Sequence, residues 1–120
     1  MRKILITNSY GAGWSSECSN TKLARYIATY QPIIDKLEED KNYFRRLGYY
    51  IFVPNDIDAD EPILKQLEKD LEKEFGLKKE EQPYLGGAMN LCVIEIPDDC
   101  YAVITQHDGK ENYKIIYDCI

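Results

Sequence analysis

Short apolar runs alternate with longer segments of helical spacing along this chain, and the alternation predicts an α+β fold. β-Branched and aromatic runs bounded by turn residues indicate strands at 3–7, 49–53, 91–96, 101–106 and 113–117. Apolar side chains three and four positions apart indicate helices at 20–30, 32–48 and 62–76. The expected order is β-α-(α)-β-α-β-β-β, giving a mixed sheet of about five strands with two to three helices packed largely on one face.

Capping and breaking residues place the ends of these helices. Ser19 or Asn20 is a suitable N-cap for the first helix, and Pro32 suits the first turn of the second. Whether the second helix is continuous or broken around 40–42 stays open. Asp60 is the expected N-cap of the third helix, and Gly76 is a natural C-terminal stop.

Turn signals organise the C-terminal half of the chain. Residues 77–90 are mostly polar and contain Pro, Gly and Gly-Gly, which predicts a long loop of the kind that is often functional. Asp108-Gly109 is a strong hairpin signal between the last two strands. With 120 residues the chain has the usual length of one domain, so residues 1–120 are expected to form a single α+β domain.

The turn after the first strand is the candidate binding site. Two glycines permit a tight turn, two serines supply hydroxyl groups, and the N–H groups of a following helix start would favour an anion there. Two aromatic side chains flank the turn and could stack on a ring, and basic residues follow in the helix. The sequence therefore predicts ligand contacts from Asn8, Tyr10, Gly11, Gly13, Trp14, Ser15, Ser16 and Arg25.

A simpler interpretation of the same turn is also open. Glycine turns greatly outnumber ligand-binding loops, so the segment can be only a tight turn with Trp14 packed into the core.

Charge and composition narrow the class of partner. The formal net charge is −6, which argues against a nucleic-acid backbone, because that partner needs clustered Lys and Arg. No apolar stretch is long enough to span a membrane, and the N-terminal apolar run is too short for a signal peptide. We therefore expect a protein of the cytoplasm, whose four widely spaced cysteines are free and mostly buried thiols rather than disulfides.

Residues for catalysis or metal binding are scarce. His107 is the only histidine, and it precedes a hairpin turn, where exposed polar residues are common. Asp56, Asp58 and Asp60 alternate like the start of a calcium loop, but Glu61 stands where that loop needs glycine, so an acidic loop and helix cap is the better interpretation. No catalytic residue, metal site or cofactor is predicted.

The motifs taken together resemble a known group of proteins. The Tyr-Gly-Ala-Gly-Trp-Ser turn at 10–15, the helix behind Asp-Glu-Pro at 60–62, the Val-Ile-Glu-Ile-Pro-Asp-Asp segment at 93–99 and Asp108-Gly109 span most of the chain. This combination is similar to a family of small uncharacterised bacteriophage and prophage proteins. The chain departs from the family pattern at 106–107, where Gln-His replaces an acid-Tyr pair.

The resemblance implies a setting more than a mechanism. Small phage accessory proteins often blunt host defence, so the leading hypothesis is a non-catalytic protein of the host cytoplasm that sequesters a small anionic, nucleotide-like immune signal. The alternative is an acidic inhibitor that binds a host defence protein directly. Ten tyrosines, a residue enriched at interfaces, add the expectation of a homo-oligomer.

Overall fold

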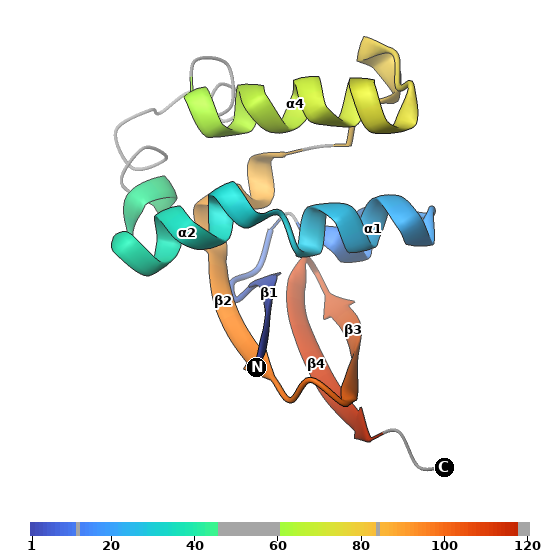
Figure 1. Ribbon diagram of the computed structural model, residues 1–120. Helices are drawn as coiled ribbons and strands as arrows, with labels where there is room; N and C mark the ends of the chain where they lie inside the picture. The colour runs from blue at the N-terminus through green and yellow to red at the C-terminus, as the bar shows by residue number, and fades with distance from the viewer. Residues whose placement is uncertain (12, 46–60, 84, 118–120) are drawn as a thin grey trace.

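The computed structural model has an α+β fold in which the helices lie above two strand pairs (Figure 1). It describes residues 1–11, 13–45, 61–83 and 85–117. The elements in chain order are β1 (Arg2–Thr7), the short 3-10 helix η1 (Ser15–Glu17), α1 (Thr21–Ala28), α2 (Gln31–Glu39), α4 (Pro62–Phe75), the 3-10 helices η2 (Lys79–Glu81) and η3 (Gly86–Asn90), β2 (Leu91–Ile96), β3 (Cys100–His107) and β4 (Lys110–Tyr117).

The described strands form two antiparallel pairs rather than one mixed sheet. β1 pairs with β2, with Leu5 opposite Val93, and β3 pairs with β4, with Ile104 opposite Tyr113. The prediction of one sheet of five strands is therefore wrong. The strand predicted at 49–53 lies outside the described residues.

Side-chain bonds take the place of a ladder where the two pairs meet. The Thr7 backbone N–H donates to the Glu111 carboxylate, and the Thr7 hydroxyl donates to the carbonyl of Gly109. Both bonds tie the end of β1 to the start of β4, but neither is a strand-to-strand backbone bond. A continuous sheet needs alternating N–H and C=O partners, so the described strands remain two separate sheets here.

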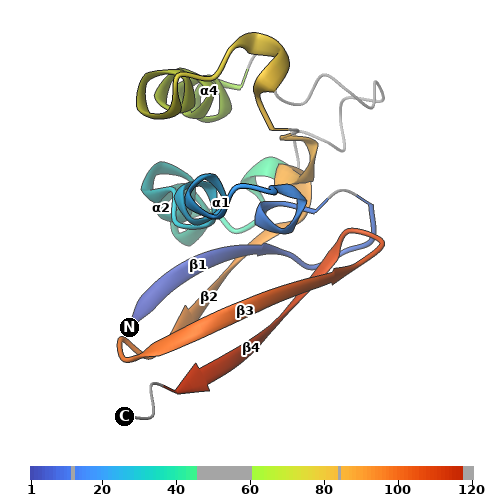
Figure 2. The same cartoon turned by 90° about the vertical axis from the view of Figure 1, so that its right-hand side faces the viewer.

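The helices lie on one side of the strands in two layers. Figure 2 shows α1 and α2 between α4 and the strands. Buried side chains of all three helices form the main core, and β1 and β2 contribute Leu5 and Leu91. None of the buried residues of this core belongs to β3 or β4, although their hairpin is part of the described chain. The hairpin is thus attached beside the core rather than built into it.

Two helix starts show how local sequence acts. The Asn20 side chain caps α1 by accepting from the Leu23 N–H at 3.1 Å, as predicted. The N-cap of α4 is Glu61, whose carboxylate accepts from the Leu64 N–H at 2.7 Å and the Tyr43 hydroxyl at 2.6 Å. The predicted cap, Asp60, lies outside the described residues. Glutamate is a less usual cap, and its two donors offset the cost of burying the Glu61 carboxylate.

The other predicted element ends agree well with the structure. α2 ends at Glu39, so the helical segment breaks within 40–42. Asp108 and Gly109 both have positive φ angles, 50° and 85°, as a two-residue hairpin turn requires. The predicted loop at 77–90 contains η2 and η3. Within the described ranges, no helix is long and apolar enough to cross a membrane.

Candidate ligand-binding groove

A buried carboxylate from the last hairpin closes the turn that follows β1. Glu111 is 2% exposed, and its Oε2 accepts from the N–H groups of Trp14 at 3.0 Å and Ser16 at 2.9 Å. The Ser16 hydroxyl donates to the same oxygen, and Oε1 accepts from the Thr7 N–H at 2.9 Å. Three backbone donors and one hydroxyl therefore converge on a single carboxylate.

The predicted anion site at this turn thus exists as a geometry, but the chain fills it. Converging N–H groups form a concavity that favours negative charge. In this protein the charge belongs to Glu111, and its four bonds stabilise a carboxylate that burial alone would disfavour. An external ligand would have to displace Glu111 to use the same donors.

The glycines of the turn serve this closure. Gly11 has a φ angle of 126°, which favours glycine, and its N–H donates to the carbonyl of Asp108 at 2.7 Å. A Cβ atom at Gly13 would lie 2.7 Å from the Ser16 Oγ atom, closer than packing allows. Gly11 therefore allows the bend of the turn, and Gly13 allows its close approach to Ser16.

Trp14 lies in the core. Its side chain is 1% exposed, and its Nε1–H donates to the carbonyl of Ile27 near the end of α1 at 2.8 Å. The stacking role predicted for Trp14 does not fit this placement, because no face of the ring is open to a ligand. The simpler interpretation of the turn describes this residue correctly.

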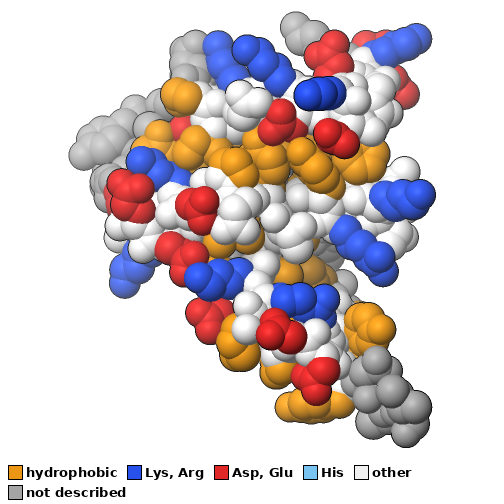
Figure 3. Space-filling model, viewed as in Figure 1, with side chains coloured by type: hydrophobic (Ala, Val, Ile, Leu, Met, Phe, Trp, Pro, Cys, Tyr) orange, Lys and Arg blue, Asp and Glu red, His pale blue; other side chains and the backbone are white. Residues whose placement is uncertain are grey.

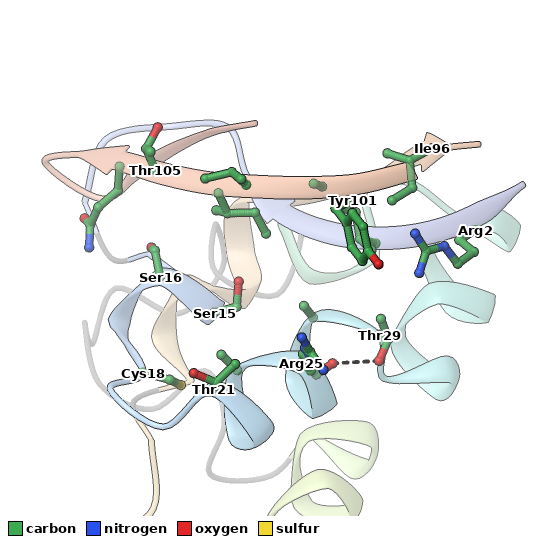
Figure 4. A pocket seen from close by; sticks show the side chains of 17 residues that line it. Arg2, Ser15, Ser16, Cys18, Thr21, Arg25, Thr29, Ile96, Tyr101 and Thr105 are labelled. Carbon is green, nitrogen blue, oxygen red and sulfur yellow. Dashed lines mark hydrogen bonds between the residues drawn. The ribbon is translucent and has the colours of Figure 1, made fainter. Parts of the chain in front are cut away.

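A groove of about 910 Å³ lies beside the turn, between α1 and the strands (Figure 4). Its volume falls within the usual range for small-molecule sites. The groove is lined by Arg2 and Ile4 of β1, Ser15, Ser16 and Cys18 at η1, Thr21, Ala24, Arg25, Ala28 and Thr29 of α1 and its C-cap, Ile96 of β2, and residues 101–106 of β3.

The charge of this lining is positive in a protein of net charge −6. Arg2 and Arg25 are the only charged side chains among the described lining residues. Both are exposed, and neither makes an ion pair or side-chain hydrogen bond within the described part of the chain. Figure 4 shows Arg2 extending from the strands at one end of the groove and Arg25 extending from α1 below Tyr101, both on the side away from Ser16.

At the opposite end of the groove, neutral donors bond to an acidic side chain. The Gln106 Nε2 atom donates to the Glu17 Oε1 atom at 3.2 Å, and the same oxygen accepts from the Gly13 N–H at 3.2 Å. Ser16, whose hydroxyl is engaged by Glu111, lies at this end too. An anion would therefore be favoured at the arginine end and disfavoured near Glu17.

The structure separates the predicted site residues into two groups. Ser15, Ser16 and Arg25 line the groove. The other five, Asn8, Tyr10, Gly11, Gly13 and Trp14, do not. Asn8 is exposed and donates its N–H to the carbonyl of Asn90 at 3.1 Å.

Tyr10 is 65% exposed and lies at the tip of the β3–β4 hairpin. Its ring contacts His107 edge-on at 6.3 Å between centroids, and the Lys110 Nζ atom lies 5.5 Å from its ring centre. The His107 side chain is 80% exposed and lies 3.5 Å from a carboxylate oxygen of Asp108, as a residue of a hairpin turn would.

Three important residues were missed from the sequence. Arg2 and Tyr101 reach the groove from the starts of strands far apart in the chain, and Glu111 reaches the turn from 97 residues beyond Trp14. No local motif marks any of them. The one available signal was that Glu111 falls, at a spacing of two, on the same strand face as Tyr113, Ile115 and Tyr117.

The side chains suited to nucleophilic or metal chemistry are not arranged for it. Burial raises the pKa of the Cys18 thiol, and the nearby Glu111 and Glu17 raise that pKa further. The reactive thiolate is therefore disfavoured at Cys18, the one cysteine among the described residues that line the groove. Within the described ranges, no group of three His, Cys, Asp or Glu side chains could hold a metal ion.

Comparisons with known proteins found no relatives. No family model matches the chain, and neither the curated proteins nor the solved structures contain a match.

Proposed function

We propose that this protein binds a small anionic ligand, without transforming it, at the arginine end of the groove. The observation that supports this proposal is the pair of arginines that are the only charges among the described lining residues of a groove of about 910 Å³. Two guanidinium groups with no acidic partner in the described chain are suited to a phosphate or carboxylate. The nearby hydroxyl of Thr29 donates to the Arg25 carbonyl at 2.6 Å and fixes the end of α1 there.

The non-catalytic part of the proposal depends on what surrounds the arginines. The described lining contains no histidine and no carboxylate, so it lacks the usual general acid or base. Burial and the acidic neighbours Glu111 and Glu17 raise the pKa of the Cys18 thiol, which disfavours the nucleophilic thiolate. Binding and sequestration need none of these groups.

The resemblance to phage proteins suggests a biological form for this activity. We infer that the ligand is a nucleotide-like immune signal of the host, held in the host cytoplasm. A homo-oligomer would multiply the number of sites, and native mass spectrometry would count the subunits and any retained ligand together.

Calorimetry on one pair of variants tests the proposal. A panel of inorganic pyrophosphate and of linear and cyclic nucleotides is titrated into the wild type, Arg25→Ala and Lys22→Ala. Lys22 is the matched control, because it loses the same charge from the same helix and does not line the groove. We expect at least one anion to bind, with affinity lowered about tenfold or more in Arg25→Ala and unchanged in Lys22→Ala.

Two results would contradict this function. An absence of binding across the panel would show that the groove is not an anion site. An equal loss of affinity in Arg25→Ala and Lys22→Ala would show a general effect of charge rather than a specific contact. Chromatography of the recovered ligand tests the non-catalytic part, since any product would show turnover.

A second candidate function is supported by the β3–β4 hairpin. Five of the seven large apolar side chains exposed in the described chain lie on it, namely Tyr101, Val103, Tyr113, Ile116 and Tyr117. The register places Tyr101, Val103 and Ile116 on one face of the hairpin and Tyr113 and Tyr117 on the other. Figure 3 shows apolar side chains among charged ones at this end of the molecule. Exposed apolar side chains concentrated on one hairpin are typical of a protein interface. An inhibitor that binds a host defence protein would use this hairpin as its interface.

One variant distinguishes the second function from the first. Tyr117→Lys places a charge on the exposed apolar hairpin, on the face opposite Tyr101 and at a position that does not line the groove. Loss of a recovered host protein in this variant, with anion binding intact, would favour the inhibitor. Loss of neither would count against the hairpin as an interface.

A further inference from the structure

We propose that the groove selects an anion that carries an aromatic ring, with the ring stacked on Tyr101 and a phosphate-type group held by Arg2 and Arg25. This inference rests on the proposed function, because it assigns the chemical class of the ligand to the same site. The residues that carry it lie together at one end of the groove in Figure 4.

Tyr101 is the only aromatic residue among the described lining residues, and its ring is open. The side chain is 57% exposed at the start of β3, and Figure 4 shows the ring extending into the groove. It has no ring partner and no side-chain hydrogen bond within the described ranges. An exposed tyrosine face beside a polar groove suits a planar ligand group, because stacking requires only a free π-face.

Other tyrosines of the protein show what an engaged ring looks like. The Tyr30 hydroxyl donates to Asp70 at 2.7 Å, and the Tyr43 hydroxyl donates to Glu61 at 2.6 Å. The Tyr26 ring packs against Phe75 at 5.5 Å between centroids. Each of these side chains therefore has a structural function, which within the described chain Tyr101 lacks.

The positions of the two arginines set the orientation of the ligand. Arg2 comes from the start of β1, Tyr101 from the start of β3, and Arg25 from the last turn of α1. Figure 4 shows the Tyr101 ring between Arg2 and the far part of the groove. A phosphate between the guanidinium groups would therefore place an attached ring beside Tyr101, which a bare anion would leave unused.

The outer edge of β3 gives the ring further partners. Six successive residues of β3, 101–106, line the groove, and β4 is the only described strand with which β3 pairs. The N–H and C=O groups that face away from β4 are therefore open to the groove as hydrogen-bonding groups. A heteroaromatic ring has donors and acceptors in its plane that fit such an edge, whereas a plain hydrocarbon ring has none.

The experiment compares two phosphates that differ by one aromatic ring. Phenyl phosphate and methyl phosphate are titrated separately while the amide resonances of the protein are followed by NMR. The proteins are the wild type, Tyr101→Ala, Tyr101→Phe and the control Tyr113→Ala. Tyr113 is an exposed tyrosine of the same hairpin that does not line the groove.

We expect the wild type to bind phenyl phosphate about tenfold more tightly than methyl phosphate. Tyr101→Ala should abolish this preference while leaving the affinity for methyl phosphate unchanged. Tyr101→Phe and Tyr113→Ala should both keep the preference, because stacking needs the ring and not the hydroxyl, and because Tyr113 lies outside the groove.

The outcomes separate this inference from the proposed function. If both phosphates bind equally in the wild type, or if the preference survives in Tyr101→Ala, the aromatic class is overturned and the anion site remains. If neither phosphate shifts the resonances of Arg25 and its neighbours, and the nucleotide panel also fails, both proposals fall together.

Discussion

Two regions of this protein concentrate groups that attract negative charge, and only one of them is filled from within. In the turn after β1, backbone donors of Thr7, Trp14 and Ser16 converge on the buried Glu111 carboxylate. In the adjoining groove, the guanidinium groups of Arg2 and Arg25 have no acidic partner in the described chain. The difference shows that an anion-binding geometry indicates a ligand site only when the chain does not supply the anion itself.

The burial of the charges follows the same division. The carboxylate of the filled region is 2% exposed, so its bonds contribute to stability and are costly to remove. The arginines of the open region are exposed, so water solvates them and they cost the folded state little. The first region therefore acts on folding, and the second is available for binding.

The largest expected effect breaks the filled region. Glu111→Gln replaces a carboxylate that accepts four hydrogen bonds with an amide whose NH₂ group must face at least one of the donors. We expect the free energy of unfolding to fall by about 3 kcal/mol, measured by urea denaturation at neutral pH. The exposed Glu95→Gln is the control, with a change within about 0.5 kcal/mol. A similar small change in Glu111→Gln would show that the carboxylate is dispensable.

A second change makes the open region resemble the filled one. Thr29→Asp places an acid beside Arg25, four residues along and at the same end of the groove. We expect the affinity for pyrophosphate or a nucleotide to fall about tenfold by calorimetry, because the new carboxylate competes for the guanidinium group.

Thr29→Asn is the matched control for that change. It has nearly the same shape as the aspartate and also removes the hydroxyl that donates to the Arg25 carbonyl, but it adds no charge. Its affinity should stay within about twofold of the wild type. An equal loss in both variants would assign the effect to the end of α1 rather than to charge.

The smallest expected effect is a change in the pH at which Cys18 is alkylated, and it depends on both the groove and Glu111. Cys18 lines the groove, and burial together with Glu111 and Glu17 raises the pKa of its thiol. A raised pKa in the folded state contributes stability below the unfolded value of about 8.5 and loses it as the pH rises through the folded pKa. Alkylation of Cys18 should therefore need a higher pH in the native protein than after denaturation.

The Glu111→Gln variant sharpens this measurement. Removing the negative charge should shift the alkylation profile of Cys18 to lower pH, and that of Cys92, whose thiol pKa Glu111 also raises, in the same direction. Cys100 is 1% exposed, and Glu111 is not among the groups that shift its thiol pKa. The alkylation of Cys100, followed by mass spectrometry, therefore reports global unfolding. Equal acceleration at all three thiols would mean that the variant has unfolded.

Much of the fold could be predicted because its signals are local. The alternation of residues 91–96, the Asp108-Gly109 turn and the apolar stripe of α4 each depend on neighbours within one element. The arrangement of the strands could not be predicted in this way. Where the two sheets meet, the Thr7 N–H donates to the Glu111 carboxylate and the Thr7 hydroxyl donates to the Gly109 carbonyl, and these bonds join residues more than 100 positions apart.

For the candidate site too, residues marked by a local motif could be predicted and residues placed by long-range packing could not. Ser15, Ser16 and Arg25 were proposed because they follow the glycine turn in sequence, and the structure places them in the lining of the groove. Trp14 was wrongly assigned to the ligand site. Its burial and its bond to the Ile27 carbonyl depend on how α1 packs, which the local sequence does not show. Arg2 and Tyr101 were missed because each stands at the start of a strand without a surrounding motif.

The bond between Trp14 and Glu111 also constrains the order in which the chain can acquire its structure. The two residues are 97 positions apart, so the donors near the N-terminus leave the ribosome long before their acceptor. Until the last hairpin is synthesised, these N–H groups have only water as a partner, and the wall of the groove that they position stays unformed. We expect nascent chains that stop short of Glu111 to retain the helical layers while the turn remains open to proteases.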